Sequence, residues 1–144
     1  MKTRKFLVLA LVLVLAVLAL FACNTKEKEP MVLTEADNFI VLKPTNDYAG
    51  KSLIEFMNSA KANGEFDFTY EESQYGAMIK TINGFGDPTD NTKAWLLYTN
   101  DEANSTTAYG TIEYQEKVYA SATVGASSLI VIENGLYIWV YKAF

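Results

Sequence analysis

Three aromatic residues alternate near the end of the sequence, at Tyr137, Trp139 and Tyr141. Because successive side chains of a β-strand point to opposite faces, this spacing places the three rings on one face and the aliphatic residues between them on the other. An open aromatic face is a platform for a flat ligand, a sugar or a partner loop, whereas a covered one is a second layer of core. The pattern leaves both interpretations open. The candidate ligand-binding residues are these three, together with Phe85 and Tyr98.

Residues suited to catalysis or metal binding are scarce. The sequence has no histidine and one cysteine, so the commonest general base is missing and neither an internal disulfide nor a cysteine metal cluster can form. Asp87 and Asp90, with Asp101 further on, offer oxygen ligands for a hard cation, but Asp-Pro-Thr-Asp is more often a solvated turn. We therefore predict no catalytic residue, no metal, no cofactor and a protein that is not an enzyme; a hydrolase with acidic catalysis is the minor alternative.

The single cysteine lies at the end of an apolar leader. Leu20-Phe21-Ala22-Cys23 follows three basic residues and an uninterrupted apolar run over 6–22, which is the arrangement of a secretory signal. The four residues resemble the bacterial lipobox, whose cysteine is diacylated and becomes the mature N-terminus. We predict lipidation of Cys23 and attachment to the extracytoplasmic face of a bacterial cell membrane. An uncleaved membrane anchor is the alternative, and it places the domain on the same side.

Charge and length limit what the rest of the chain does. Without the leader, nine Lys and Arg face 17 Asp and Glu, a net charge of −8, which argues against nucleic acid as a partner because phosphate contacts rest on basic side chains. The predicted organisation is a signal peptide over 1–22, a lipidated cysteine and flexible tether over 23–37, and one folded domain over 38–144.

One amphipathic helix is predicted near the start of the domain. Ser52 lies three residues before Glu55, the spacing of a capping box at a helix N-terminus. Gly64 can adopt the left-handed conformation that ends a helix. The apolar residues between them recur with helical spacing at Leu53, Phe56, Met57 and Ala60.

The remaining elements are predicted strands. Asn83-Gly84 is typical of a tight turn, Gln115-Glu116 links a hairpin with less typical turn residues, and Asn134-Gly135 indicates a final hairpin. The apolar strand over 94–99 is expected to be central and buried on both faces. The predicted strands cover 39–42, 66–70, 77–82, 94–99, 111–114, 117–120, 129–132 and 136–141. One helix packed on a mainly antiparallel sheet defines the α+β class.

The order of these segments resembles the transcobalamin-like C-terminal domain, a small β-grasp-like module of bacterial surface lipoproteins. The resemblance covers about 38–144 and implies a β-grasp-like fold. Two stretches depart from the pattern, Asn100-Asp101 and Gly135-Leu136. The residues that carry the resemblance are 51–57, 76–85, 94–100 and 133–141.

The resemblance also implies a function. In the vertebrate corrinoid carriers this domain covers one face of cobalamin, while a larger helical domain, which this chain lacks, holds the other. The expected function is therefore a lipid-anchored extracytoplasmic binding module, with a corrinoid or other small planar ligand as the leading class. The alternative is a cell-surface adhesion or scaffold domain that recognises a protein or glycan.

Overall fold

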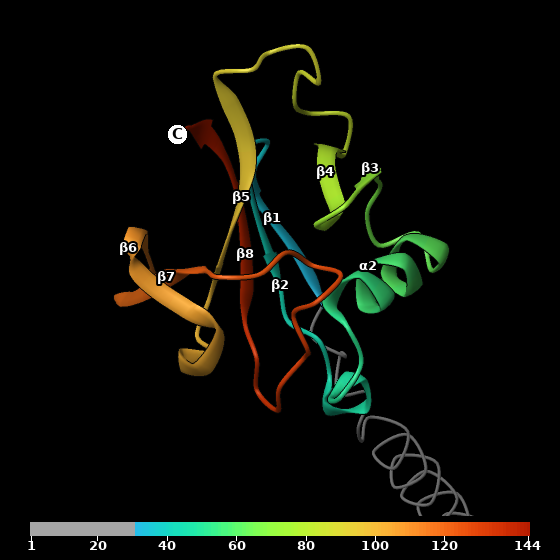
Figure 1. The fold of residues 1–144 in the computed structure, drawn as a ribbon. Coiled ribbons are helices and arrows are strands. Elements are labelled where there is room, and N and C mark those ends of the chain that lie inside the picture. Colours follow the sequence, from blue (N-terminus) through green and yellow to red (C-terminus); the bar gives the residue numbers. More distant parts are fainter. Residues whose placement is uncertain (1–30) are drawn as a thin grey trace, which may run out of the picture.

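A six-stranded sheet forms the centre of the domain, with strand order β1-β2-β8-β5-β7-β6 (Figure 1). The computed structural model describes residues 31–144. Every pair of neighbouring strands in the sheet is antiparallel. The strands are β1 (Val32–Ala36), β2 (Phe39–Leu42), β5 (Lys93–Thr99), β6 (Ser105–Tyr114), β7 (Lys117–Ala122) and β8 (Tyr137–Ala143).

A second, two-stranded sheet and the helix lie on one side of this sheet (Figure 1). The small sheet is the antiparallel hairpin of β3 (Phe68–Ser73) and β4 (Gly76–Ile82), and the helix is α2 (Leu53–Ala62). Two short 3-10 helices complete the described elements, η1 (Asn46–Tyr48) and η2 (Glu102–Asn104). The α+β class and the mainly antiparallel sheet are confirmed.

Helix α2 begins and ends where the local sequence predicts. The Ser52 hydroxyl accepts a hydrogen bond from the Glu55 amide (3.4 Å), and the Ser52 amide donates to the Glu55 carboxylate (2.8 Å), which completes a capping box. Gly64 follows the last turn with φ of +75°. The four predicted apolar residues are buried: Leu53, Phe56, Met57 and Ala60.

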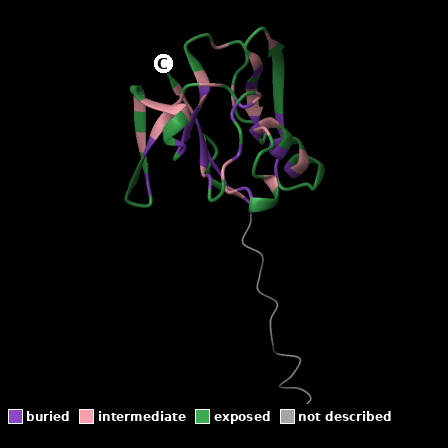
Figure 2. Cartoon of the chain, turned by 60° about the horizontal axis from the view of Figure 1, so that its bottom comes forward, coloured by how far each residue is buried: buried purple, intermediate pink, exposed green. Residues whose placement is uncertain are grey.

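The main sheet is covered on both faces, and buried residues follow its central strands (Figure 2). Helix α2 and the β3–β4 hairpin cover the face that carries Tyr137 and Trp139. The opposite face, with Ile138 and Val140, packs against aromatic side chains of the β6–β7 hairpin. The predicted alternation along the last strand is therefore confirmed. Its aromatic face is the one that meets the helix.

The predicted final hairpin is wrong in one arm. Asn134 adopts φ of +56°, as a turn requires, but residues 129–132 do not pair with β8. The Leu53 amide instead donates to the Leu129 carbonyl (2.8 Å), and the Val131 amide donates to the Lys51 carbonyl (2.8 Å). The reason is that β8 has only two edges, and β2 and β5 occupy both.

The folded part begins earlier than the predicted boundary at residue 38. Val32–Ala36 forms the edge strand β1 against β2, and Met31 is buried. Val32 and Leu33, two apolar residues of the predicted tether, pair with the end of β2. The predicted signal peptide, the lipobox, Cys23 and the first part of the tether lie outside the described residues. Within residues 31–144, no helix has the length and apolarity needed to cross a bilayer.

The hairpin of β6 and β7 turns at the predicted place. Gln115 and Glu116 both adopt positive φ, 49° and 60°, which are the angles of a two-residue hairpin turn. At the end of β6, the Tyr114 hydroxyl donates to the Glu35 carboxylate of β1 (2.7 Å). This bond joins the two outer strands of the sheet across its aliphatic face. Burial, with the Glu35 carboxylate beside it, raises the pKa of Tyr114 to about 12.

Candidate functional site

A hollow lies between the β3–β4 hairpin, strand β5 and the chain that follows β7. We call it the β4–β5 groove. It has a volume of about 350 Å³, at the lower end of the range for small-molecule sites. It is lined by Ser73, Tyr75–Ile79, Trp95–Leu97, Ser121–Gly125 and Trp139. A second hollow of about 180 Å³ adjoins it through Met78, Ile79 and Trp95.

The walls of the β4–β5 groove are apolar or hydroxylated and carry no carboxylate or ammonium group. Two of its residues are exposed hydrophobics, Tyr75 with 81% and Met78 with 51% of its surface accessible. Tyr75 lies in the two-residue turn of the β3–β4 hairpin. An uncharged hollow with exposed apolar rims is unusual on a domain with a net charge of −8, and such patches commonly mark binding sites.

Both tryptophans of the sequence line the groove, Trp95 from β5 and Trp139 from β8. Their residues are 5% and 4% exposed. The indole N–H of Trp95 donates to the Phe85 carbonyl (3.3 Å). The indole N–H of Trp139 is buried and has no acceptor among the described residues. Trp139 thus lines the groove without offering this buried donor to it.

An aromatic cluster joins the loop between β4 and β5 to strands β5 and β8. Phe85 stands edge-on to both Tyr141 (5.6 Å between ring centroids) and Trp95 (6.3 Å), and Trp95 lies 5.5 Å from Tyr141. Gly86 is required for this packing. A Cβ there would lie 2.5 Å from the Lys80 carbonyl oxygen, and its φ is +120°.

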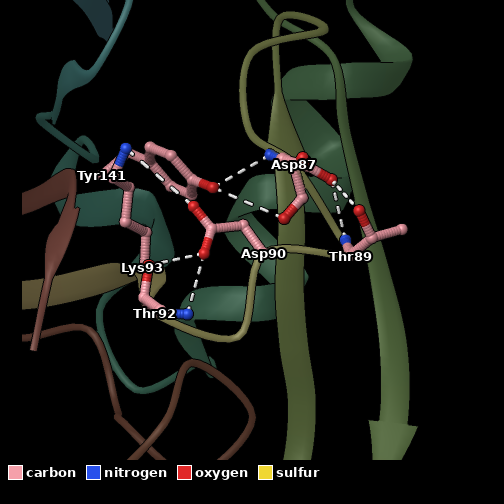
Figure 3. A network of polar contacts seen from close by, with 6 residues as sticks. All are labelled: Asp87, Thr89, Asp90, Thr92, Lys93 and Tyr141. Atoms are coloured by element: carbon pink, nitrogen blue, oxygen red, sulfur yellow. Dashed lines mark hydrogen bonds and ion pairs between the residues drawn. The ribbon is translucent and has the colours of Figure 1, made fainter.

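The acidic loop beside this cluster holds its carboxylates in local hydrogen bonds (Figure 3). Asp87 Oδ1 accepts from the hydroxyl (2.6 Å) and the amide (2.8 Å) of Thr89, and these bonds lower the pKa of Asp87. Asp90 accepts from Thr92 in the same way, which lowers the pKa of Asp90. The Tyr141 hydroxyl accepts from the Asp87 amide (3.0 Å). These two aspartates thus organise a turn.

The third candidate carboxylate, that of Asp101, lies outside the loop of Asp87 and Asp90. Asp101 is buried and caps η2, accepting from the Ala103 amide (3.1 Å) and the Asn104 side chain (2.8 Å). Among residues 31–144, no group of three or more Cys, Asp or Glu is placed to hold a metal ion.

The five predicted ligand-binding residues do not form one open surface, which corrects the platform interpretation. Tyr137 is fully buried, and its hydroxyl accepts from the Ile132 amide (2.9 Å). Tyr98 is also fully buried, on the opposite face of the sheet, and its hydroxyl has no partner among the described residues. The aromatic face of β8 was expected to be either an open platform or a second layer of core. It is core, because helix α2 and the β3–β4 hairpin pack against it. Trp139 still reaches the groove, while Phe85 and Tyr141 meet in the aromatic cluster.

Several groove residues could not be identified from the sequence. Tyr75 and Met78 carry no periodic signal, and their exposure at the groove depends on where the β3–β4 hairpin packs. Trp95 was expected in a strand buried on both sides, and this is confirmed, but that pattern gives no sign that the strand borders a hollow.

Comparisons with protein families, with curated proteins and with solved structures find no match to this chain. The resemblance to the transcobalamin-like C-terminal domain stays a prediction.

Proposed function

We propose that this protein is a non-enzymatic binding module, attached through a lipid on Cys23 to the extracytoplasmic face of a bacterial membrane, that holds its ligand in the β4–β5 groove. The observation that carries this proposal is the groove itself, an uncharged hollow rimmed by Tyr75 and Met78 on an acidic domain. The lipobox supports the location. The polar side chains that line the groove carry hydroxyls, which orient a ligand more readily than they transform it.

The ligand class that these walls favour is small, partly apolar and planar. Aromatic and methionine side chains give flat, adaptable contact surfaces. A corrinoid is the leading candidate by family resemblance, and it would contact the groove with one edge of its ring system. A β-grasp-like relationship to that family is part of the proposal, supported by the single helix packed on the sheet.

The alternative function is recognition of a protein or glycan at the cell surface. The 81% exposure of Tyr75 favours it, because aromatic residues that stand free on a surface are common anchors of interfaces.

The two tryptophans make the groove directly observable. In the full-length protein in detergent, intrinsic tryptophan fluorescence reports on Trp95 and Trp139, both of which line the groove. Titration with cyanocobalamin to ~100 μM should quench it beyond a control of free tryptophan at equal absorbance, since that concentration detects affinities tighter than about −5.5 kcal/mol. Tyr75→Ala and Met78→Asp should each weaken quenching.

Matched controls separate binding at the groove from loss of a surface aromatic or apolar residue. Tyr109 and Val118 are 74% and 69% exposed and do not line the groove. Tyr109→Ala and Val118→Asp should leave quenching unchanged. Absence of quenching in the wild-type protein would remove the corrinoid and favour the protein or glycan alternative. Equal weakening by groove and control variants would contradict the placement of the site.

A further inference from the structure

We propose that the β4–β5 groove accepts an extended, uncharged peptide segment, which adds to the free edge of β5 as a further antiparallel or parallel strand. This inference rests on the proposed function, because it places the ligand in the same groove and names its class. Strand addition to an exposed sheet edge is a common mode of peptide recognition. It requires an unpaired edge, space beside it and walls that suit the side chains.

The edge of β5 is free over most of its length. On one side, β5 pairs with β8 from Lys93 to Thr99. On the other side, it pairs with β7 only at Tyr98 and Thr99. The five residues from Lys93 to Leu97 therefore have no paired strand on that side, a length of about 16 Å at the rise of an extended chain.

Hydrogen bonds at the end of β5 show which backbone groups point to this edge. The Asn100 amide donates to the Leu136 carbonyl (3.4 Å), on the β8 side. In an antiparallel ladder each residue directs its N–H and C=O to the same side, and successive residues alternate. Trp95 and Lys93 are an odd number of positions from Asn100. They therefore direct their N–H and C=O groups to the free edge.

The neighbouring strand gives the same assignment independently. Tyr141 is the register partner of Trp95 on β8. Its amide donates to the Asn38 carbonyl (3.0 Å), next to β2 and away from β5. Because partners of this kind exchange no hydrogen bonds, the backbone of Trp95 also points away from β8.

The groove reaches this edge from the face of the sheet that carries Trp139. Trp95, Leu96 and Leu97 all line it, although successive side chains of a strand point to opposite faces. The space is the continuation of the position that β7 occupies beside Tyr98. After Ser121 the chain leaves this position, and residues 121–125 form a wall of the groove.

Strand β4, on the other wall, does not fill this edge. It pairs with β3 alone, and its Ala77 amide donates to the Ser127 hydroxyl (2.9 Å). A side chain thus satisfies a backbone donor of β4, whereas no group among the described residues does so for Trp95. Exposed strand edges are usually protected by charges, proline or a bulge. The free edge of β5 has only Lys93, at its first position.

Charge selects the kind of segment that fits. The groove lining is uncharged, and the domain around it is acidic, so buried or acidic charges on the occupant are disfavoured. The two lysines of the adjoining hollow are already paired, Lys80 with Glu71 (2.9 Å) and Lys93 with Asp90 (3.9 Å). A segment with neutral side chains over about five residues matches these walls.

The test uses peptides of about ten residues, long enough to cover the free edge, selected from a random library on the full-length protein in detergent. The tightest binder is then synthesised in two further forms, with N-methyl groups on alternate amides along one edge or along the other. N-methylation on the edge that faces β5 should weaken binding at least about tenfold, whereas the other form should bind like the parent.

Two variants at the start of β5 test the protein side of the pairing. Lys93→Pro removes an N–H that points to the free edge, at a first strand position where proline is tolerated. Lys93→Ala removes the same charge and keeps the N–H. Lys93→Pro should weaken peptide binding several-fold and Lys93→Ala should not. In hydrogen exchange by NMR, the Trp95 amide should exchange fast in the free protein and slowly with peptide, while the Leu96 amide is protected in both.

The outcomes separate this inference from the proposed function. If no peptide is selected, or if both N-methylated forms bind like the parent, strand addition is wrong, while cyanocobalamin quenching can still support the groove. A Trp95 amide protected in the free protein would also overturn it. Protection that grows with protein concentration would assign the edge to a second copy of the chain and not to a peptide. If neither cyanocobalamin nor peptide alters tryptophan fluorescence, both proposals fall.

Discussion

Replacement of Trp139 by alanine is the sharpest test of the buried aromatic face. Trp139 is 4% exposed and belongs to the core cluster between the sheet and α2. A buried tryptophan removes roughly 150–250 Å² from water, which corresponds to about 4–6 kcal/mol, and compactness of the unfolded chain reduces this figure. Measured truncations of this type cost about 3–5 kcal/mol.

The unpartnered indole N–H shifts this expectation downward. Because Trp139 Nε1 has no acceptor among the described residues, its removal relieves a desolvated donor and offsets roughly 1 kcal/mol of the loss. We therefore expect Trp139→Ala to lower the free energy of unfolding by about 3 kcal/mol. Trp139→Phe, which keeps most of the apolar area and removes the N–H, should cost about 1 kcal/mol or less.

The assay is urea unfolding followed by far-ultraviolet circular dichroism, with the slope of the transition checked for all three proteins. A loss below about 1 kcal/mol for Trp139→Ala would refute the reasoning, because a side chain that stabilises so little is not core. The open aromatic platform would then return as the better interpretation. A Trp139→Phe variant as unstable as Trp139→Ala would show that the N–H makes a bond that the structure does not contain.

Three further predictions concern other parts of the molecule. Tyr98→Phe should leave unfolding stability unchanged or raise it by up to about 1 kcal/mol in urea titrations, because the buried Tyr98 hydroxyl has no partner; a clear loss would reveal a bond to that hydroxyl. The pKa of Tyr114 is raised to about 12 from 10.0, so its contribution to stability is complete below pH 10 and is lost as pH rises toward 12. Urea midpoints across that range should fall more for the wild type than for Tyr114→Phe, and parallel curves would contradict this. Cys23→Ala should abolish labelling by a fatty-acid probe in a bacterial host, and undiminished labelling would remove the lipoprotein prediction.

Local features of the fold were predictable because neighbouring residues decide them. The capping box of Ser52 and Glu55, the stop at Gly64 and the turn at Asn83-Gly84 depend on backbone preferences within a few residues. The alternation of β8 is likewise local, and it correctly separates aromatic from aliphatic faces.

Features that depend on competition between distant segments were not predictable. Residues 129–132 have the composition of a strand, but β2 and β5 occupy both edges of β8, so this segment bonds to the start of α2. Strand β1 lies in a largely polar stretch and forms because β2 offers it an edge.

The sequence by itself determines the net negative charge of this protein, its helix and the alternating faces of its strands, since each follows from composition or from spacing along the chain. Its location outside the membrane stays a prediction. Only the tertiary structure decides that the aromatic face is covered and that a groove opens beside Trp95. The position of that groove depends on β7 leaving β5 at Ser121 and on where the β3–β4 hairpin packs. Both are set by contacts between residues far apart in the chain, which no local pattern encodes.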